Sequence, residues 1–507
     1  MTMKKTPIAI VCMLAFLASC SDNTSTCYYL DATNGNDSNN GTSPEKAWKT
    51  IARTEGLVLK PGEQLLLKRG ETFVGNLDIC GQGSADSLVV VGAYGDGEKP
   101  VITAPDSSLY AVRIYNSDYI TVKDLEIVNT GSEEMPGRTG VEVDIREFGV
   151  SHNVTLDDLY IHDVNGSRVK QLGGGSAINF SYHSKETLSR FDGLCIQNCH
   201  IARCQRNAII WEGEADRDKW FPSTNVVVRQ NLIEEVPGDG IVPIWCDGCL
   251  IEYNIMRNCP ETLPDTEAAA GFWPWSCDNT VIQFNEVSDH KAPWDAQAYD
   301  CDYNCRNTTI QYNYSHDNYG GLVLVCNCNT EPERWNVGNQ NSLVQYNLSI
   351  NDGLRPNLAR GSMFSPAIHF GGHSTNTHIR NNIIHQNVKA SKDIDTRMFV
   401  SDSWNGYADS TYIEGNIFYA ASPSSFDMTR STNNFFKGNI LIGQFRNAPE
   451  RANVPVYVDL YKQYVLDKGE DGFAGLSLLL EQKEVCGVKG NFVNSLLMHL
   501  VFSQLLK

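Results

Sequence analysis

A seven-residue pattern recurs eleven times along this chain, at intervals of 23 to 40 residues. Its second position is apolar in every copy, and its third is always polar or charged. The apolar second positions are Val122, Leu156, Ile196, Val228, Ile251, Ile282, Ile310, Val344, Ile379, Ile413 and Phe436. Internal repeats of this length predict a solenoid, in which each repeat packs only against its neighbours.

The pattern within each copy is that of a β-strand, because an apolar residue is followed by a polar one. The fifth position is Asn in the last eight copies. Asn tolerates the left-handed conformation and bonds its own backbone, which suits a tight bend. Asparagines stacked at this bend can form a ladder; Leu125, Leu159 and Cys199 replace it in the first copies.

Tandem helices are excluded, because the intervals between copies lack 3.6-residue periodicity and are rich in Asn, Gly and Thr. The sequence therefore predicts an all-β chain, a parallel β-helix of about eleven coils. Right-handed winding is expected, because crossovers between parallel strands are almost always right-handed.

The residues before the first copy support this fold. Residues 28–44 are rich in Asn, Asp and Gly, and they precede the segments 47–51, 59–63 and 66–73. Together with the coils, this lead-in resembles the pectate-lyase-like right-handed parallel β-helix family of bacterial polysaccharide lyases and glycoside hydrolases. The resemblance covers residues 28–445 and implies a fold rather than one reaction. We expect residues 47–59 to form a helix that closes the open end.

The N-terminus reads as a targeting segment. Lys4 and Lys5 precede a short apolar run at residues 8–17, which is too short to span a bilayer. The next residues, Leu-Ala-Ser-Cys ending at Cys20, resemble the lipobox of bacterial lipoproteins. This resemblance implies cleavage before Cys20 and attachment of lipid to its thiol. We therefore expect the protein on the bacterial outer membrane or cell surface, held to the membrane only by this lipid.

Five segments follow from these observations. They are a signal peptide at 1–19, a tether at 20–27, an N-terminal cap at 28–100, the β-helix at 101–445 and a tail at 446–507. The tail departs from the repeat, because residues 476–481 and 492–507 are apolar and resemble helices. A helical cap and an altered C-terminus both remain open.

Charge limits the partners of the chain. The net charge is −19, and no basic stripe offsets repulsion by phosphate, which argues against nucleic acid. We expect a monomer that acts on a polysaccharide.

The 16 cysteines are scattered over many coils, and several hold positions that are apolar elsewhere. Cys246 with Cys249, Cys301 with Cys305, and Cys326 with Cys328 could suggest metal, but structural zinc uses compact modules. Buried free thiols are the favoured reading, ahead of disulfides and then zinc.

A second series of short strands follows the repeat and predicts where substrate binds. Alternation along these strands suggests one outward-facing row of carboxylates, indoles and an imidazole. Its members are Asp144, Asn179, Glu212, Trp245, Trp273 or Trp275, Asp300 with Asp302, and His369. Aromatic faces stack on sugar rings while polar neighbours fix the hydroxyl groups. The indole of Trp294 is a further candidate platform.

Residues 290–304 hold the densest set of chemical groups. Asp300 and Asp302 should share one strand face, roughly 6.5–7 Å apart, a separation that leaves room for water in an inverting glycosidase. His290 or His316 could tune their pKa values. Further catalytic candidates are Asp295 and Glu212. The same Asp-x-Asp pair could instead bind calcium or be merely solvated. We interpret His152, His162, His183 and His385 as structural.

Three functions remain open. The first is a glycoside hydrolase with paired carboxylates, which needs no cofactor. The second is a polysaccharide lyase, which must neutralise a uronate with Ca²⁺ or a basic side chain. Lys291, Arg306, Arg206 and Arg360 are available, but they form no evident basic cluster. The third is a solenoid that binds glycan without catalysis.

Overall fold

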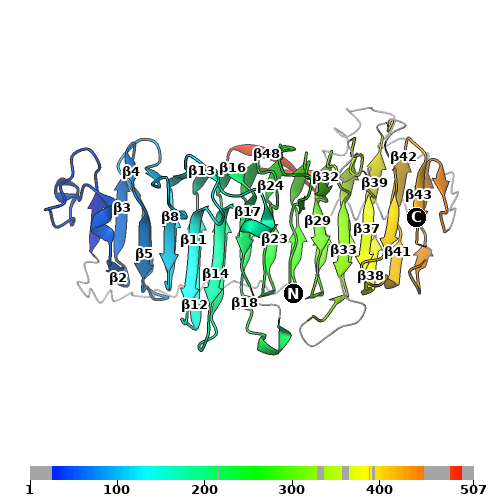
Figure 1. The fold of residues 1–507 in the computed structure, drawn as a ribbon, viewed down its shortest axis with the longest axis horizontal. Helices are drawn as coiled ribbons and strands as arrows, with labels where there is room; N and C mark the ends of the chain where they lie inside the picture. The colour runs from blue at the N-terminus through cyan, green and yellow to red at the C-terminus, as the bar shows by residue number, and fades with distance from the viewer. Residues whose placement is uncertain are drawn as a thin grey trace, which may run out of the picture.

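The fold is a single rod of stacked coils (Figure 1). The computed structural model describes residues 26–449, apart from 214–215, 328–335, 357–364, 388, 391–393, 395 and 429, and also residues 480–493. The signal peptide and Cys20 lie outside the described residues. No helix within the described part is long and apolar enough to cross a bilayer.

One parallel sheet of 13 strands runs the length of the rod, and each coil contributes one strand to it. Its strands are β4 (Thr72–Val74), β7 (Val101–Thr103), β10 (Glu126–Asn129), β13 (Tyr160–Asn165), β16 (His200–Gln205), β20 (Leu232–Glu234), β24 (Ile255–Arg257), β27 (Glu286–Ser288), β32 (Tyr314–His316), β36 (Leu348–Ile350), β39 (Ile383–Gln386), β42 (Ile417–Ala420) and β45 (Ile440–Ile442). The prediction of about eleven coils is therefore two too few. Of the two extra strands, β4 lies inside residues 28–100, which were expected to form a cap, and β7 begins at the first residue after that segment.

A second parallel sheet, of 18 strands, carries the repeat itself. It begins with β1 (Cys27–Leu30), β3 (Gln64–Lys68), β6 (Val89–Tyr94) and β9 (Ile120–Lys123), and ends with β44 (Phe435–Lys437). The apolar second positions of the first ten copies are fully buried, at 0% exposure, and line the core.

The bend between these two sheets holds the predicted asparagine ladder. Each side-chain amide donates to the side-chain carbonyl of the next asparagine, at 2.9–3.1 Å. The eight members are Asn231, Asn254, Asn285, Asn313, Asn347, Asn382, Asn416 and Asn439. All are buried, so the ladder satisfies polar groups that would otherwise be costly in the core.

The expected left-handed conformation belongs to other residues. The residue before each ladder asparagine has a positive φ, as Tyr253 and Phe284 do at 56°. Left-handed asparagines instead form a second, exposed ladder through Asn279, Asn307 and Asn341.

The two ends also differ from expectation. Residues 47–59 form no α-helix; the described turns are short, η1 (Pro44–Lys46) and η2 (Ile51–Thr54), and Trp48 and Ile51 close the core. In the tail, β47 (Leu480–Val485) and β48 (Val488–Val493) form an antiparallel hairpin, while most of the segments expected to be helical, residues 476–479 and 494–507, lie outside the described residues. Val485 of this hairpin packs on Leu232 and Ile255 in the middle of the rod (Figure 1).

The third face of the rod consists of two parallel sheets with a gap between them. The first contains β2 (Val58–Leu59), β5 (Leu77–Gly81), β8 (Tyr110–Tyr115), β11 (Thr139–Arg146), β14 (Ser176–His183), β17 (Asn207–Trp211) and β21 (Ile241–Val242). The second contains β29 (Tyr299–Cys301), β33 (Val323–Asn327), β37 (Ile368–Gly372), β40 (Phe399–Asp402), β43 (Ser424–Asp427) and β46 (Phe445–Arg446).

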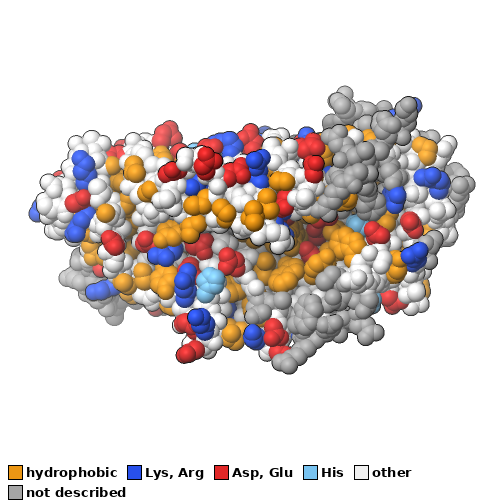
Figure 2. Space-filling model, viewed as in Figure 1, with side chains coloured by type: hydrophobic (Ala, Val, Ile, Leu, Met, Phe, Trp, Pro, Cys, Tyr) orange, Lys and Arg blue, Asp and Glu red, His pale blue; other side chains and the backbone are white. Residues whose placement is uncertain are grey.

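Residues 272–275 fill the gap between these sheets with isolated bridges only, at Phe272 and Trp275. Pro243 and Pro274 lie beside the break, and proline has no N–H to donate to a ladder. The interruption opens the face next to β29, and Figure 2 shows this face hollowed along its middle.

Candidate functional site

The register of the third face places its outward side chains in two columns rather than one row. The first column is Arg113, Glu142, Asn179, Ile210, Val242, Trp273, Asp300, Leu324, His369 and Val400. The second is Tyr115, Asp144, Ser181, Glu212, Ile244, Trp275, Asp302, Cys326, Gly371 and Asp402. Asp300 and Asp302 share one strand face, as predicted, but Asp144, Asn179 and Glu212 lie three to five coils away.

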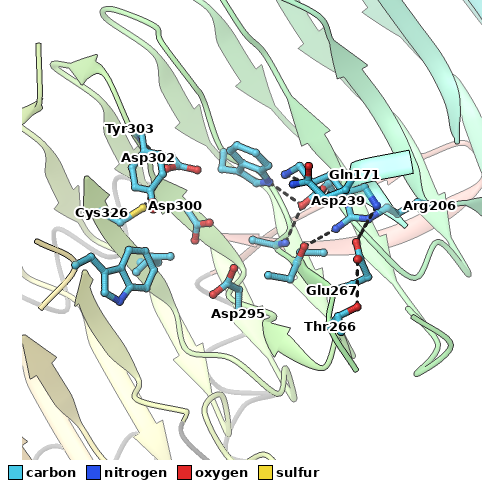
Figure 3. A pocket seen from close by; sticks show the side chains of 17 residues that line it. Gln171, Arg206, Asp239, Thr266, Glu267, Asp295, Asp300, Asp302, Tyr303 and Cys326 are labelled. Atoms are coloured by element: carbon cyan, nitrogen blue, oxygen red, sulfur yellow. Dashed lines mark hydrogen bonds and ion pairs between the residues drawn. The ribbon is translucent and has the colours of Figure 1, made fainter. Parts of the chain in front are cut away.

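A cavity of about 310 Å³ opens at the interruption, and we call it the carboxyl cavity. Five carboxyl side chains line it, and three of them, those of Asp295, Asp300 and Asp302, lie on the side away from Arg206. Figure 3 shows these three side chains along one side of the cavity and an ion-paired cluster on the other. The structure thus brings Asp295 together with the predicted pair.

Asp295 reaches the cavity from a separate short strand. It ends β28 (Trp294–Asp295), which pairs with β25 (Ala268–Ala269) beside the third face. The buried guanidinium of Arg355 donates to the carbonyls of Ala292, Pro293 and Asp295 at 2.6–3.1 Å and fixes this segment. A Cβ at Gly320 would lie 2.3 Å from the Asp295 carbonyl, so only glycine allows this approach.

The environment of the three carboxyl groups disfavours their charged forms. Burial and the charge of Asp302 raise the pKa of Asp295 to about 6. Burial raises the pKa of Asp302 to about 6 as well. Burial, and then the charges of Asp302 and Asp295, raise the pKa of Asp300 well above its ordinary value. Such shifts are typical of catalytic carboxyl groups.

Asp302 differs from Asp300 in its hydrogen bonds. The Tyr303 N–H donates to Asp302 Oδ1 at 2.5 Å, and the Cys326 thiol donates to the same oxygen at 3.1 Å. Both bonds favour the carboxylate and work against the effect of burial. Asp300 Oδ1 is buried and has no hydrogen-bond partner among the described residues. The surroundings of Asp302 therefore favour the ionised form more than those of Asp300, which favour the protonated form.

The other side of the cavity is held by buried ion pairs. Arg206, fully buried, pairs with Asp239 and with Glu267, the latter at 3.2 Å. Asp239 also accepts from the Trp273 indole N–H at 3.1 Å. Burial acts to raise the pKa of Asp239, but Arg206 and Lys170 hold it below its ordinary value. Asp239 and Glu267 were not candidates in the sequence, because no short motif links them to residues 290–304.

Lys170 is the most exposed cation at the cavity. It is the first residue of the turn η3 (Lys170–Leu172), 3.9 Å from Asp239 and 4.9 Å from the centre of the Trp273 ring system. Trp404 and Tyr303 line the cavity near Cys326. Of the four tryptophans predicted as platforms or row members, only Trp273 lines this cavity. Trp245 is buried and donates to the Phe221 carbonyl, and Trp275 and Trp294 lie outside the lining.

His290 and His316 do not line the carboxyl cavity, whereas His369 holds its predicted place in the outward row. His290 is fully buried, bonds the Gly238 carbonyl and does not line the cavity. His316 lies on the 13-stranded sheet, between Glu286 and Asp317. His369 occupies the first column two coils beyond Asp300, is buried, and packs edge-on against Trp404. His290 and His316 are close to Asp300 and Asp302 in the sequence, but the intervening turns place them on other sides of the rod.

The cysteines and acidic side chains bear on the metal and disulfide alternatives. Within the described ranges, no group of three or more His, Cys, Asp or Glu side chains is arranged to hold a metal ion. All 13 described cysteines are free thiols, and nine of them are buried, which confirms the favoured interpretation.

Comparisons with known proteins agree with the fold. A family model described as a right-handed β-helix region matches residues 188–349 and 222–401. A GH136 lacto-N-biosidase from Eubacterium ramulus is similar in structure, with a TM-score of 0.56 and 23% identity over 83% of this chain and 67% of that one.

Two curated relatives have glycosidase names. Lacto-N-biosidase from Bifidobacterium longum is 28% identical over 78% of this chain and 29% of its own length. Alpha-1,3-galactosidase A from Akkermansia muciniphila is 26% identical over 27% of this chain and 25% of its own length. The chain thus spans less than a third of the length of these relatives. The matched family model and the stacked parallel coils show that this chain has the right-handed parallel β-helix fold.

Proposed function

We propose that this chain is a carbohydrate-active enzyme, a glycoside hydrolase that cleaves glycans in the carboxyl cavity. The observation that carries the proposal is the convergence of Asp295, Asp300 and Asp302 on one cavity, each with a raised pKa. Glycosidases use two carboxyl groups in different protonation states. The glycosidase names of both curated relatives support the same class.

Asp302 and Asp295 are the best pair for the two roles. Asp302 receives two hydrogen bonds that favour its anion, so it acts at the anomeric carbon, as a nucleophile or through a water molecule. Asp295 stands on a separate strand, is less buried than Asp300, and donates its proton to the leaving oxygen. The protonated Asp300, whose Oδ1 lacks a partner, donates to a sugar hydroxyl between them.

A lyase mechanism is less well supported by the basic residues. Elimination needs a free cation or Ca²⁺ at the uronate carboxylate. Arg206 is committed to Asp239 and Glu267. Arg306 pairs with Asp278, and Lys291 lies 3.4 Å from Asp289. Arg360 lies outside the described residues.

The substrate we propose is a glycan that ends in lacto-N-biose, the sugar in the name of the Bifidobacterium longum relative. A neutral sugar suits a cavity that contains five carboxyl groups, because a uronate would add charge repulsion. The indole of Trp273 and the ring of Trp404 offer apolar surface for sugar C–H groups. From the leader, we also propose that lipid on Cys20 holds the enzyme at the cell surface.

The test is product analysis with a panel of glycans, including an aryl glycoside of lacto-N-biose and uronate polymers. We expect new reducing ends without the ultraviolet absorbance of an unsaturated uronate. Absorbance that EDTA abolishes would instead support a calcium-dependent lyase. Glycan binding without any product would identify a non-catalytic solenoid and overturn the proposal.

A further inference from the structure

A second cavity lies on the same face, toward the N-terminal coils. It measures about 300 Å³ and is lined by residues within 182–189, by residues 212–213, and by Lys219 and Phe221. Glu212 lines it and belongs to the same outward column as Asp302, three coils away. Three strand spacings amount to about 14 Å. We call this space the distal cavity.

The wall of the distal cavity is anchored to the coil that carries the catalytic candidates. Arg217, in the turn η4 (Arg217–Lys219), donates to Asn304 Oδ1 at 3.1 Å and pairs with Asp278 at 3.1 Å. Its guanidinium also stacks on Trp220, 3.8 Å from the ring centre. Asn304 lies two residues after Asp302. The turn that carries Lys219 into the distal cavity is therefore bonded to the segment that follows Asp302.

The distal cavity combines one apolar side with a few polar groups. Leu188 is 47% exposed at its edge, and Phe221 and Trp245 line it. Glu212 is well exposed, with the Asn179 amide at 3.4 Å and His183 at 3.6 Å. Apolar surface beside fixed acceptors and donors is the arrangement that binds sugar rings and their hydroxyl groups. His183, interpreted from the sequence as structural, is part of this lining.

We propose that the distal cavity is a second sugar-binding subsite for the same glycan, occupied by neutral hexose or N-acetylhexosamine units remote from the cleaved bond. This inference rests on the proposed hydrolase function. Binding energy from remote sugar units can then be used at the reacting bond. A short glycoside that fills only the carboxyl cavity gains no binding energy from the distal cavity.

The experiment compares kcat/KM for two substrates, an aryl lacto-N-bioside and a glycan extended by several neutral sugars. The variant combines Leu188→Ser with Glu212→Gln, both well exposed. We expect kcat/KM for the extended glycan to fall about tenfold, while the aryl glycoside changes less than about twofold. The matched control is Leu109→Ser, an exposed leucine outside both cavity linings, which should alter neither value.

An equal loss on both substrates would overturn the inference, because it would mean a role at the carboxyl cavity or a folding defect. An unchanged value for the extended glycan would also overturn it. If a sialylated extension raises kcat/KM more than a neutral extension does, the proposed neutral class of ligand is rejected. If the wild type cleaves neither substrate, the hydrolase function fails separately. Titration calorimetry with the extended glycan then tests the subsite, through weaker binding by the double variant.

Discussion

The buried asparagine ladder and the outward columns of the third face are built by the same device, side chains stacked on successive coils. In the ladder, each side-chain amide from Asn231 to Asn416 donates to the next asparagine. The hydrogen-bonding groups of one coil are therefore satisfied by those of the next. In the columns the residue type changes at almost every coil. At β29 this leaves Asp300 Oδ1 buried without a partner.

The difference shows how a solenoid separates architecture from chemistry. A repeated polar residue satisfies itself and stabilises the rod, because each copy is both donor and acceptor. A column that is interrupted, as at Pro243 and Pro274, leaves groups whose missing partner a substrate can supply. Unsatisfied buried groups that cost stability are expected at functional sites.

The largest effect should come from Asp302→Asn. We expect the hydrolysis rate to fall by at least about 10³-fold, because the amide can act neither as nucleophile nor as base. Initial rates on the aryl lacto-N-bioside measure the loss. Asp317→Asn, an exposed carboxylate on another face, is the matched control and should retain the wild-type rate. A wild-type rate in Asp302→Asn would reject this assignment.

Asp295→Asn should also lower the rate, by about 10²–10⁴-fold on a natural glycan. An aryl leaving group needs little protonation, so the loss on an aryl glycoside should be much smaller. The two substrates are compared for this variant and for Asp300→Asn. If Asp300→Asn rather than Asp295→Asn shows this leaving-group dependence, the acid is Asp300.

In the ladder, Asn313→Ala should destabilise the fold without a direct effect on catalysis. It removes the side-chain acceptor of the Asn285 backbone N–H and the side-chain donor to the Ile282 carbonyl, at a cost of about 1–3 kcal/mol. Urea unfolding gives the free energy. Asn307→Gly removes an exposed asparagine of the second ladder and tolerates its left-handed backbone, so it should cost less. Equal losses would mean that burial does not distinguish the two ladders.

The pH dependence of kcat/KM should form a narrow bell with its maximum near pH 6. The rate falls below this because Asp302, with a pKa of about 6, becomes protonated. It falls above this because Asp295, also with a pKa of about 6, loses its proton. Rates between pH 4 and 8 measure both limbs. A flat profile up to pH 8 would exclude Asp295 as the acid.

The smallest effect concerns the thiol next to Asp302. Cys326→Ala removes a hydrogen bond that favours the Asp302 carboxylate, so the pKa of Asp302 should rise and the acidic limb should move to higher pH. Cys326→Ser should restore the position of the limb. Cys305→Ala, a buried thiol that does not line the cavity, controls for packing. The same limb in all three variants would assign Cys326 a packing role only.

The sequence predicted the coils and the ladder well because both depend on residues that repeat. It also predicted the Asp300 and Asp302 strand face, since alternation within a strand is local. It could not predict which turn side chains return to that face. Asp239 and Glu267 reach the cavity from two other coils, and His290 turns inward to the Gly238 carbonyl. The loops that set these positions vary in length, since the copies recur at intervals of 23 to 40 residues, and no periodicity encodes them.

The most direct test of this account is a crystal structure of Asp302→Asn soaked with a glycan that ends in lacto-N-biose. The account predicts sugar rings in the carboxyl cavity, with the glycosidic oxygen about 2.6–3.2 Å from the Asp295 carboxyl group. Glycan seated on another face of the rod, with the carboxyl cavity empty, would contradict it.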